Sequence, residues 1–171
     1  GADLQEGAAA LGGMTAPKGR GEQCRLSVGG GEVQLIDESY NANPASMRAA
    51  FSVLAQATPG GSGRRIAVIG DMRELGKDAD QLHAELEVPI REAAIDRVFC
   101  AGPHMAALWD KLPDDAKAHH REEAKDLIEL LLKDVQPGDV VMIKGSLGTR
   151  MGPLVEALKK EYPPADDIEA A

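Results

Sequence analysis

Aromatic residues are scarce in this chain, because Phe, Trp and Tyr together make up 3% of its 171 residues. The core must therefore rest on Ala, Val, Ile and Leu, and the 43% hydrophobic content is enough for one compact domain. No apolar run is long enough to span a bilayer, and the start Gly1-Ala2-Asp3 lacks the basic segment of a secretory signal. We expect a cytoplasmic protein without membrane insertion.

Basic side chains are also in deficit, since 28 acidic residues stand against 19 basic ones and give a formal net charge of −9. This charge argues against nucleic-acid binding as a main role. Cys24 and Cys100 lack CxxC spacing and indicate reduced structural thiols. The adjacent His119 and His120 would point to opposite faces of a strand, so we predict no metal site.

Hydrophobic periodicity predicts strands that alternate with helices from Gln34 onward. The predicted strands cover residues 24–28, 33–37, 65–70, 96–101, 116–120 and 140–144, and the first two should form a hairpin. The predicted helices start at Asn43-Pro44, at 78 (to 94, kinked or split by Pro89), at Gly102-Pro103, at 122 (to 135) and before Leu154. The order implies an α/β fold: a Rossmann-like three-layer sandwich, with a mostly parallel sheet, helices on both faces and an N-terminal antiparallel hairpin.

The segment from Ile36 to Met47 carries the clearest functional signal. It joins a strand end to a helix start, where Asn43 is a candidate N-cap and Pro44 fits the first helical position. In open α/β sheets, ligands bind beside such strand ends. An ordinary capped loop explains the same pattern, so the segment by itself leaves both interpretations open.

A phosphate-binding loop is missing from the chain. No GxxxxGK[ST] motif occurs, and Lys144-Gly145-Ser146 has the wrong order and no preceding glycine cluster. The chain alone is therefore not expected to bind a nucleoside triphosphate in the usual way. We also predict no catalytic nucleophile or general base within it.

Four segments, in order, resemble the C-terminal part of the Mur ligases. They are Lys18 to Glu22, Asp37 to Met47, Ile66 to Gly76, and Lys144 to Ser146. The resemblance implies a domain of an ATP-dependent ligase that adds D-alanyl-D-alanine to UDP-N-acetylmuramoyl tripeptide through an acyl phosphate, in peptidoglycan synthesis. ATP and Mg²⁺, and the tripeptide, would be bound mainly by other domains, while this one positions the dipeptide and closes over ATP. The alternatives are a related Mur or folylpolyglutamate-type ligase domain and a free-standing, non-catalytic α/β ligand-binding module.

The same resemblance divides the chain. Residues 1–21 would be the tail of a preceding central ATPase domain and a linker, with a short Ala-rich helix over 3–11. Residues 22–162 would be the Mur ligase C-terminal domain, and residues 163–171 a disordered tail.

Nucleotide binding is the first role that the resemblance assigns. It falls to Arg20, Asp37, Tyr40, Asn41 and Asn43. A guanidinium can clamp phosphate or ribose oxygens, and Asp37 resembles an aspartate that accepts hydrogen bonds from ribose hydroxyls. The plainer alternatives are a solvated Arg20 and an Asn43 that only caps the helix.

Dipeptide binding is the second role, and it falls to Asp71, Lys144, Gly145, Ser146 and Arg150. Lys144 and nearby N–H groups would bind the carboxylate, and Asp71 would orient the ammonium. The family commonly has arginine where Leu147 stands, so Arg150 is expected to serve instead. A turn residue at Asp71 and a snorkelling Lys144 are the alternatives. His83 resembles a family histidine whose role the sequence does not reveal.

Overall fold

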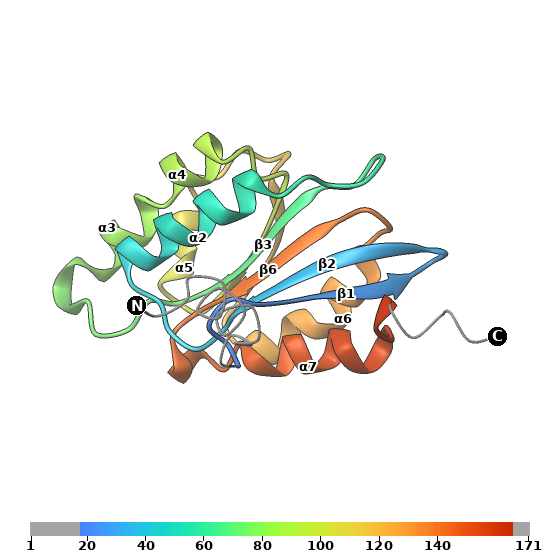
Figure 1. Cartoon of the computed structure of the whole chain (residues 1–171). Helices are drawn as coiled ribbons and strands as arrows, with labels where there is room; N and C mark the ends of the chain where they lie inside the picture. The colour runs from blue at the N-terminus through green and yellow to red at the C-terminus, as the bar shows by residue number, and fades with distance from the viewer. Residues whose placement is uncertain (1–17, 166–171) are drawn as a thin grey trace, which may run out of the picture.

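The computed structural model describes residues 18–165, and within that range six strands form a single sheet in the order β1-β2-β6-β3-β4-β5. The strands are β1 (Glu22–Val28), β2 (Gly31–Glu38), β3 (Arg65–Gly70), β4 (Arg97–Ala101), β5 (Lys117–Arg121) and β6 (Val140–Lys144). β1 and β2 pair antiparallel, and all other neighbours pair in parallel (Figure 1). The predicted α/β fold with an antiparallel N-terminal hairpin is confirmed.

Helices cover both faces of this sheet (Figure 1). One face carries α2 (Pro44–Gln56), α3 (Ala79–Ala84), α4 (Glu87–Glu92) and α5 (Met105–Trp109), and the other carries α6 (Ile128–Asp134) and α7 (Gly152–Glu161). Short 3₁₀ turns lie at η1 (Gly76–Asp78), η2 (Ala124–Leu127) and η3 (Leu147–Thr149). Because side chains alternate along a strand, β3 sends Ile69 into one core and Val68 into the other.

The start of α2 follows the sequence prediction closely. The Asn43 side chain accepts a hydrogen bond from the Ser46 N–H at 2.8 Å, and the Asn43 N–H donates to the Ser46 hydroxyl at 2.9 Å. This reciprocal capping box satisfies two backbone donors that a helix start otherwise leaves free. The helix then buries Met47, Phe51 and Leu54 against the sheet.

Two predicted helices are interrupted. The segment 78–94 divides into α3 and α4, with a turn at Glu85 and Leu86. Pro89 has no N–H to donate to the Glu85 carbonyl, so the break lies one turn before the proline. The segment 122–135 begins as η2 and becomes α6 only at Ile128, since Glu123 at its start makes no side-chain cap.

The prediction of a disordered tail is wrong for its first residues. The Ser27 N–H donates to the Pro163 carbonyl at 2.8 Å, and Leu26 forms an isolated antiparallel bridge with Pro164. These contacts cover the otherwise unpaired edge of β1. The rest of that tail (166–171) and the predicted helix over 3–11 lie outside the described residues, and the domain boundaries stay predictions. No helix between residues 18 and 165 combines the length and apolar character needed to cross a membrane.

Candidate functional site

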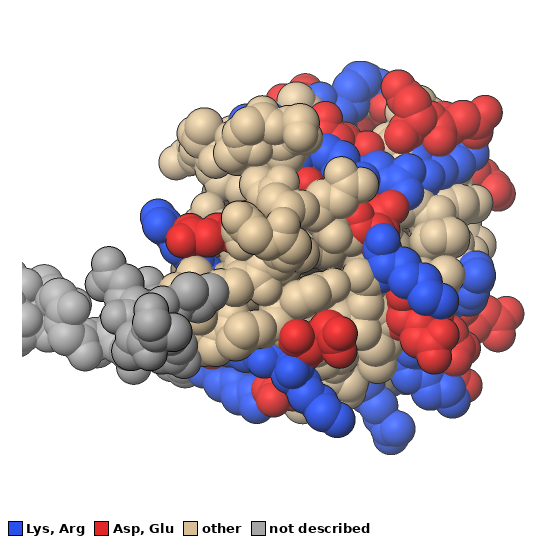
Figure 2. Space-filling model, turned by 90° about the vertical axis from the view of Figure 1, so that its right-hand side faces the viewer, with Lys and Arg blue, Asp and Glu red and all other residues tan. Residues whose placement is uncertain are grey.

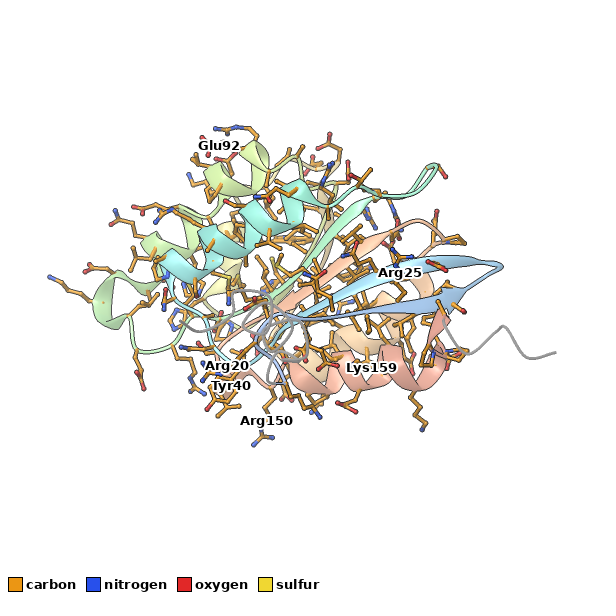
Figure 3. The ribbon with its side chains drawn as sticks, viewed as in Figure 1. Arg20, Arg25, Tyr40, Glu92, Arg150 and Lys159 are labelled. Atoms are coloured by element: carbon orange, nitrogen blue, oxygen red, sulfur yellow. The ribbon has the colours of Figure 1, made fainter. Side chains whose placement is uncertain are left out.

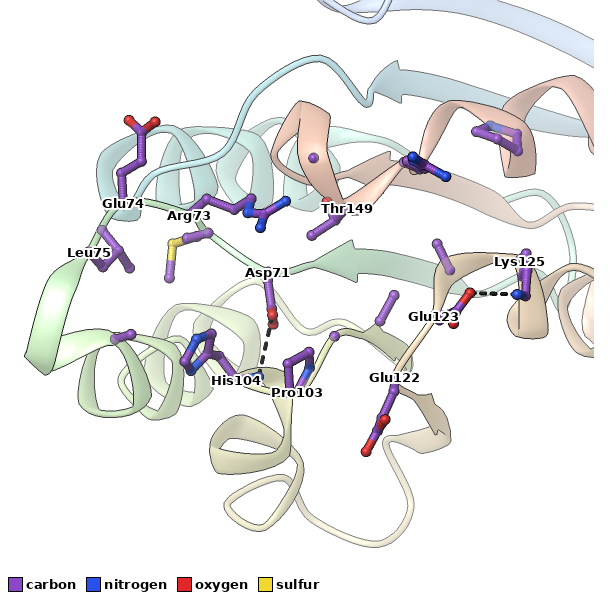
Figure 4. A pocket seen from close by; sticks show the side chains of 18 of the residues that line it. Asp71, Arg73, Glu74, Leu75, Pro103, His104, Glu122, Glu123, Lys125 and Thr149 are labelled. Carbon is purple, nitrogen blue, oxygen red and sulfur yellow. Dashed lines mark hydrogen bonds and ion pairs between the residues drawn. The ribbon is translucent and has the colours of Figure 1, made fainter.

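The strand order produces a cleft between β3 and β6. These neighbouring strands are parallel, but the chain leaves β3 toward α3 on one face and leaves β6 toward α7 on the other. Loops that depart in opposite directions from adjacent strands open a crevice at the carboxyl edge of the sheet. A cleft of about 720 Å³ lies there (Figure 4).

Loops after β3, β4, β5 and β6 all contribute to this cleft. They supply residues 71–76, 102–104, 122–125 and 148–150, together with Ala79, Ala101 and Pro153. Arg73, Lys125 and Arg150 bring positive charge, whereas Asp71, Glu74, Glu122 and Glu123 bring negative charge. A cleft with charged groups of both signs suits a small zwitterion better than a polyanion.

Glycines allow the strand ends to approach one another closely beneath the cleft. A Cβ atom built on Gly145 would lie 2.5 Å from Met151 Cγ and 3.2 Å from the Gly70 Cα. Gly102 has a φ of +120°, and its Cβ would lie 2.3 Å from the Asp71 carboxyl carbon. Gly145, which the sequence predicts as a ligand-binding residue, is therefore required for packing under the site.

Asp71 lines the cleft and also connects two of its walls. Its Oδ1 accepts a hydrogen bond from the Met105 N–H at 3.0 Å, and its Oδ2 accepts one from the His104 N–H at 3.4 Å (Figure 4). The residue is buried, and its side chain is 8% exposed at the floor of the cleft. Asp71 thus holds the loop after β4 against the loop after β3, and its predicted contact with a dipeptide stays a prediction.

Ser146 joins the loops that follow β2, β3 and β6. Its N–H donates to the Asp71 carbonyl at 3.2 Å, and its hydroxyl accepts from the Arg73 N–H at 2.9 Å and donates to the Ala42 carbonyl at 3.4 Å. Ser146 is buried and does not line the cleft. Its hydrogen bonds make it a support for the site's backbone.

Lys144 lies behind the cleft and is 2% exposed. Its Nζ donates to the Asn41 carbonyl at 2.8 Å and lies 3.4 Å from Glu38 Oε2. Burial lowers the pKa of the Lys144 ammonium below its ordinary value, and the attraction of Glu38 opposes that shift. The predicted contact with a dipeptide carboxylate stays a prediction, while the observed partners make Lys144 a support for the loop after β2.

Arg20 and Tyr40 form a separate exposed pair, which does not line the cleft. The Arg20 guanidinium carbon lies 4.1 Å from the centre of the Tyr40 ring, and the two residues lie together in Figure 3. A stacked guanidinium and ring present one flat surface with donors at its rim. Arg20 and Tyr40 are both among the predicted nucleotide-binding residues, and that role stays a prediction.

The other predicted nucleotide residues already have backbone partners. Asp37 is 1% exposed, and its carboxylate accepts hydrogen bonds from the Gly19 N–H at 3.1 Å and the Ser39 N–H at 3.0 Å. Asn41 Oδ1 accepts from the Ala42 N–H at 2.8 Å, and Asn43 caps α2. Their roles toward a nucleotide stay predictions, and Asp37 holds the segment before β1 to the end of β2.

Sequence reasoning missed several cleft residues: Arg73, Glu74, His104, Glu123 and Lys125. A signal was available for two of them, because Arg73 and Glu74 lie in the segment that resembles the Mur ligases. In the structure, Glu74 has a φ of +65° and the predicted Arg150 a φ of +54°, while Ala94, the third non-glycine residue with positive φ between residues 18 and 165, is not in the cleft lining. Such conformations are uncommon outside glycine and gather at functional sites.

Glu123 and Lys125 form an ion pair of 2.6 Å at the rim of the cleft (Figure 4). The hydrogen bond to Lys125 lowers the pKa of Glu123 below its ordinary value, with a smaller contribution from the charge of Arg150. The same hydrogen bond raises the pKa of Lys125. Both groups are therefore charged at neutral pH and available to a ligand that displaces the pair.

Known proteins are similar in sequence to this chain over nearly its whole length. The UDP-N-acetylmuramoyl-tripeptide–D-alanyl-D-alanine ligase of Bacillus subtilis is 30% identical over 149 residues, which cover 85% of this chain and 32% of that protein. The ligase of the same name from Rickettsia prowazekii is 28% identical over 156 residues, which cover 91% of this chain and 33% of that protein. The chain thus spans about a third of the length of these relatives.

Solved structures and a protein family agree with these matches. A crystal structure of MurF from Acinetobacter baumannii superposes with a TM-score of 0.74 at 27% identity, covering 92% of this chain and 34% of its own. The crystal structure of MurF ligase from Thermotoga maritima, in complex with ADP, superposes with a TM-score of 0.70 at 25% identity. The match covers 88% of this chain and 33% of that one. The family described as Mur ligase, glutamate ligase domain, matches residues 19–147. The chain therefore belongs to the Mur ligase family.

Proposed function

We propose that this chain is the domain that positions D-alanyl-D-alanine in a UDP-N-acetylmuramoyl-tripeptide–D-alanyl-D-alanine ligase. The observation that carries the proposal is the cleft of mixed charge at the carboxyl edge, in a chain whose relatives bear that name. The dipeptide has a carboxylate at one end and an amine at the other, so it matches a cleft that offers both signs of charge.

Within the cleft, Asp71 would orient the ammonium of the dipeptide before it loses a proton. Arg150 is exposed at the opposite loop and would bind the carboxylate, as a guanidinium does with two parallel hydrogen bonds. Gly145 and Ser146 hold these loops at the required spacing, and Lys144 supports the loop behind them. The domain's contribution to the reaction is thus positioning.

The nucleotide would meet this domain at the Arg20–Tyr40 pair. We place most of the binding of ATP, Mg²⁺ and the tripeptide outside the chain, because its sequence has no phosphate loop. Among residues 18–165, no group of three or more His, Cys, Asp or Glu is arranged to hold a metal ion. ATP would convert the tripeptide carboxylate to an acyl phosphate, which the dipeptide amine attacks as phosphate leaves. Closure of this domain would exclude the water that otherwise hydrolyses that intermediate.

A titration of the ¹⁵N-labelled chain with D-alanyl-D-alanine tests the cleft directly. We expect amide shifts confined to the cleft loops (71–76, 102–104, 122–125 and 148–150) and weaker shifts with the L,L dipeptide or with the N-acetylated D,D dipeptide. Arg150→Met should weaken binding roughly tenfold by removing a charged partner, while Arg48→Met, on the remote helix α2, serves as the matched control. Equal responses to all three peptides, or shifts outside these loops, would contradict the proposal.

A ligation assay tests the place of the chain within the enzyme. The chain alone should give no ATP turnover with all substrates present, whereas a protein of the relatives' full length should ligate the dipeptide. Amide formation by the chain alone would show that the nucleotide site is contained within it.

A further inference from the structure

His83 lies directly beneath the cleft, and both of its ring nitrogens are engaged. The residue is fully buried, with an exposure of 0%. Nδ1 lies 2.6 Å from the Ala79 carbonyl oxygen, and the Met72 N–H donates to Nε2 at 2.9 Å. A carbonyl can only accept a hydrogen bond and a backbone N–H can only donate one. Nδ1 therefore carries the proton, and Nε2 is the unprotonated acceptor. The two partners therefore select one neutral tautomer.

The acceptor holds one end of the peptide unit that links Asp71 to Met72. The other end of the same unit is the Asp71 carbonyl, which accepts from the Ser146 N–H at 3.2 Å. The next N–H along the chain, that of Arg73, donates to the Ser146 hydroxyl at 2.9 Å. His83 and Ser146 thus clamp the backbone on both sides, at the point where β3 ends and the cleft wall begins.

This clamp determines where two cleft side chains start. The Asp71 carboxylate and the Arg73 guanidinium belong to the residues on either side of Met72, and both line the cleft. The Asp71 Oδ1 lies 3.8 Å from His83 Nε2, which has no proton to share with it. The carboxylate therefore keeps its backbone donors, whereas a proton on Nε2 would point toward Asp71 and displace the Met72 N–H.

The His83 ring also supports a residue in the opposite wall. It stacks on the ring of His104 with centroids 5.6 Å apart and planes inclined by 24°. His104 lines the cleft, and its Nδ1 lies 2.7 Å from Asp80 Oδ1. His83 is therefore in contact with groups from both the loop after β3 and the loop after β4.

We propose that His83 is a positioning residue for the dipeptide site, which acts through its unprotonated Nε2 by holding the Asp71–Met72 peptide unit. The identity of the ligand rests on the proposed function above, whereas the tautomer and the hydrogen bond do not. His83 does not itself touch the ligand, because it is buried below Asp71 and His104.

The first test is the ring of His83 in the unaltered chain. Long-range ¹H–¹⁵N correlation spectra should show a protonated Nδ1 and an unprotonated Nε2 near neutral pH. The Met72 amide should exchange slowly with solvent, as expected for a buried hydrogen-bonded N–H. A protonated Nε2, or fast exchange at Met72, would overturn the proposal without any use of a ligand.

Two isosteres of the ring separate positioning from packing. The amide of His83→Gln reaches the position of Nε2 and can still accept from Met72, whereas the amide of His83→Asn reaches only the position of Nδ1. We expect His83→Asn to weaken D-alanyl-D-alanine binding by roughly tenfold and to speed Met72 exchange, because a buried donor loses its partner. We expect His83→Gln to stay within about twofold of the unaltered chain.

The outcomes distinguish the two proposals. Equal losses in both variants would assign His83 a packing role and overturn the inference, as would unchanged binding in His83→Asn. If the unaltered chain does not bind the dipeptide, the proposed function fails, while the ring tautomer and Met72 exchange still decide the role of His83. If His83→Asn does not fold, His83→Gln must still preserve binding and slow exchange.

Discussion

The two edges of the sheet use charged side chains in opposite ways. At the amino edge, Arg64 donates to Asp139 at 2.8 Å and Arg97 donates to Asp134 at 2.7 Å, so these ions are paired with one another. At the carboxyl edge, Asp71 and Ser146 bind mainly backbone groups, and cations such as Arg150 are left exposed. The comparison shows a difference in emphasis: the amino edge buries its ion pairs, whereas the carboxyl edge has exposed pairs such as Glu123–Lys125 and an exposed Arg150 that can meet a ligand.

The amino edge is centred on Asp139, whose exposure is 1%. Its carboxylate accepts hydrogen bonds from the Arg64 backbone and guanidinium and from the Gln136 N–H. The bond to Asp139 raises the pKa of the Arg64 guanidinium. Figure 2 looks toward this end of the molecule and shows basic and acidic side chains interspersed. A buried ion with this many donors costs most when its partner is removed.

The largest effect is therefore expected from Asp139→Ala. Loss of the carboxylate leaves Arg64 and several N–H groups without partners, which should lower the free energy of unfolding by about 3 to 5 kcal/mol. Urea denaturation measures this, and Asp114→Ala, at an exposed ion pair with Lys117, is the control that should change by less than about 0.5 kcal/mol. If dipeptide affinity falls in folded Asp139→Ala, the separation of the two edges is incorrect.

Gly145→Ala probes the close packing under the cleft. The added methyl would collide with Met151 and Thr149, so we expect a loss of about 1 to 3 kcal/mol together with weaker dipeptide binding. Gly60→Ala is the matched control, since its Cβ would make an ordinary contact of 3.5 Å with the Gly138 Cα. Urea denaturation and dipeptide titration of both variants would measure the free energy of unfolding and the affinity. Equal stability of the two variants would argue against tight packing around Gly145.

The variants Lys144→Met and Arg150→Met test whether these two cations at the carboxyl edge have different roles toward ATP and the dipeptide. From the sequence, Lys144→Met is expected to raise the KM for the dipeptide more than the KM for ATP. The partners of Lys144 favour the reverse order, because its Nζ holds the Asn41 carbonyl beside the Arg20–Tyr40 pair. Arg150→Met should raise the dipeptide KM roughly tenfold as a lost charged contact. Steady-state kinetics of a protein of the relatives' full length that contains this chain, with each substrate varied separately, would distinguish the two orders.

The smallest effect concerns pH and lies away from both edges. Partial burial, with a lesser contribution from Arg121, lowers the pKa of His119 below its ordinary value of 6.5. The unfolded chain therefore binds a proton more readily, so this contribution to stability is present above pH 6.5 and is lost as pH falls through the lower, folded pKa. His119→Gln should flatten the fall in melting temperature between about pH 7 and 5. If the melting temperature of His119→Gln depends on pH as strongly as that of the unaltered chain, other groups cause the dependence.

Short-range patterns in the sequence were sufficient for the elements and for the family. Continuous apolar runs mark β3 and β6, because strands buried on both faces need no polar alternation. Asn43 and Pro44 mark the start of α2, because capping chemistry involves only residues close in the chain. The ordered segments from Lys18 to Ser146 were sufficient to identify the Mur ligase family, because recognising them does not require knowledge of the fold.

The tertiary structure alone decided which of the predicted residues meet. β6 inserts between β2 and β3, which aligns Lys144 with Glu38 and places Ser146 against Ala42 and Asp71. The cleft likewise needs loops after four strands, and His83 acquires its acceptor role only through Met72, eleven positions away on the far side of η1. Such neighbours depend on strand order and on burial of polar groups, which are long-range properties that local periodicity does not encode.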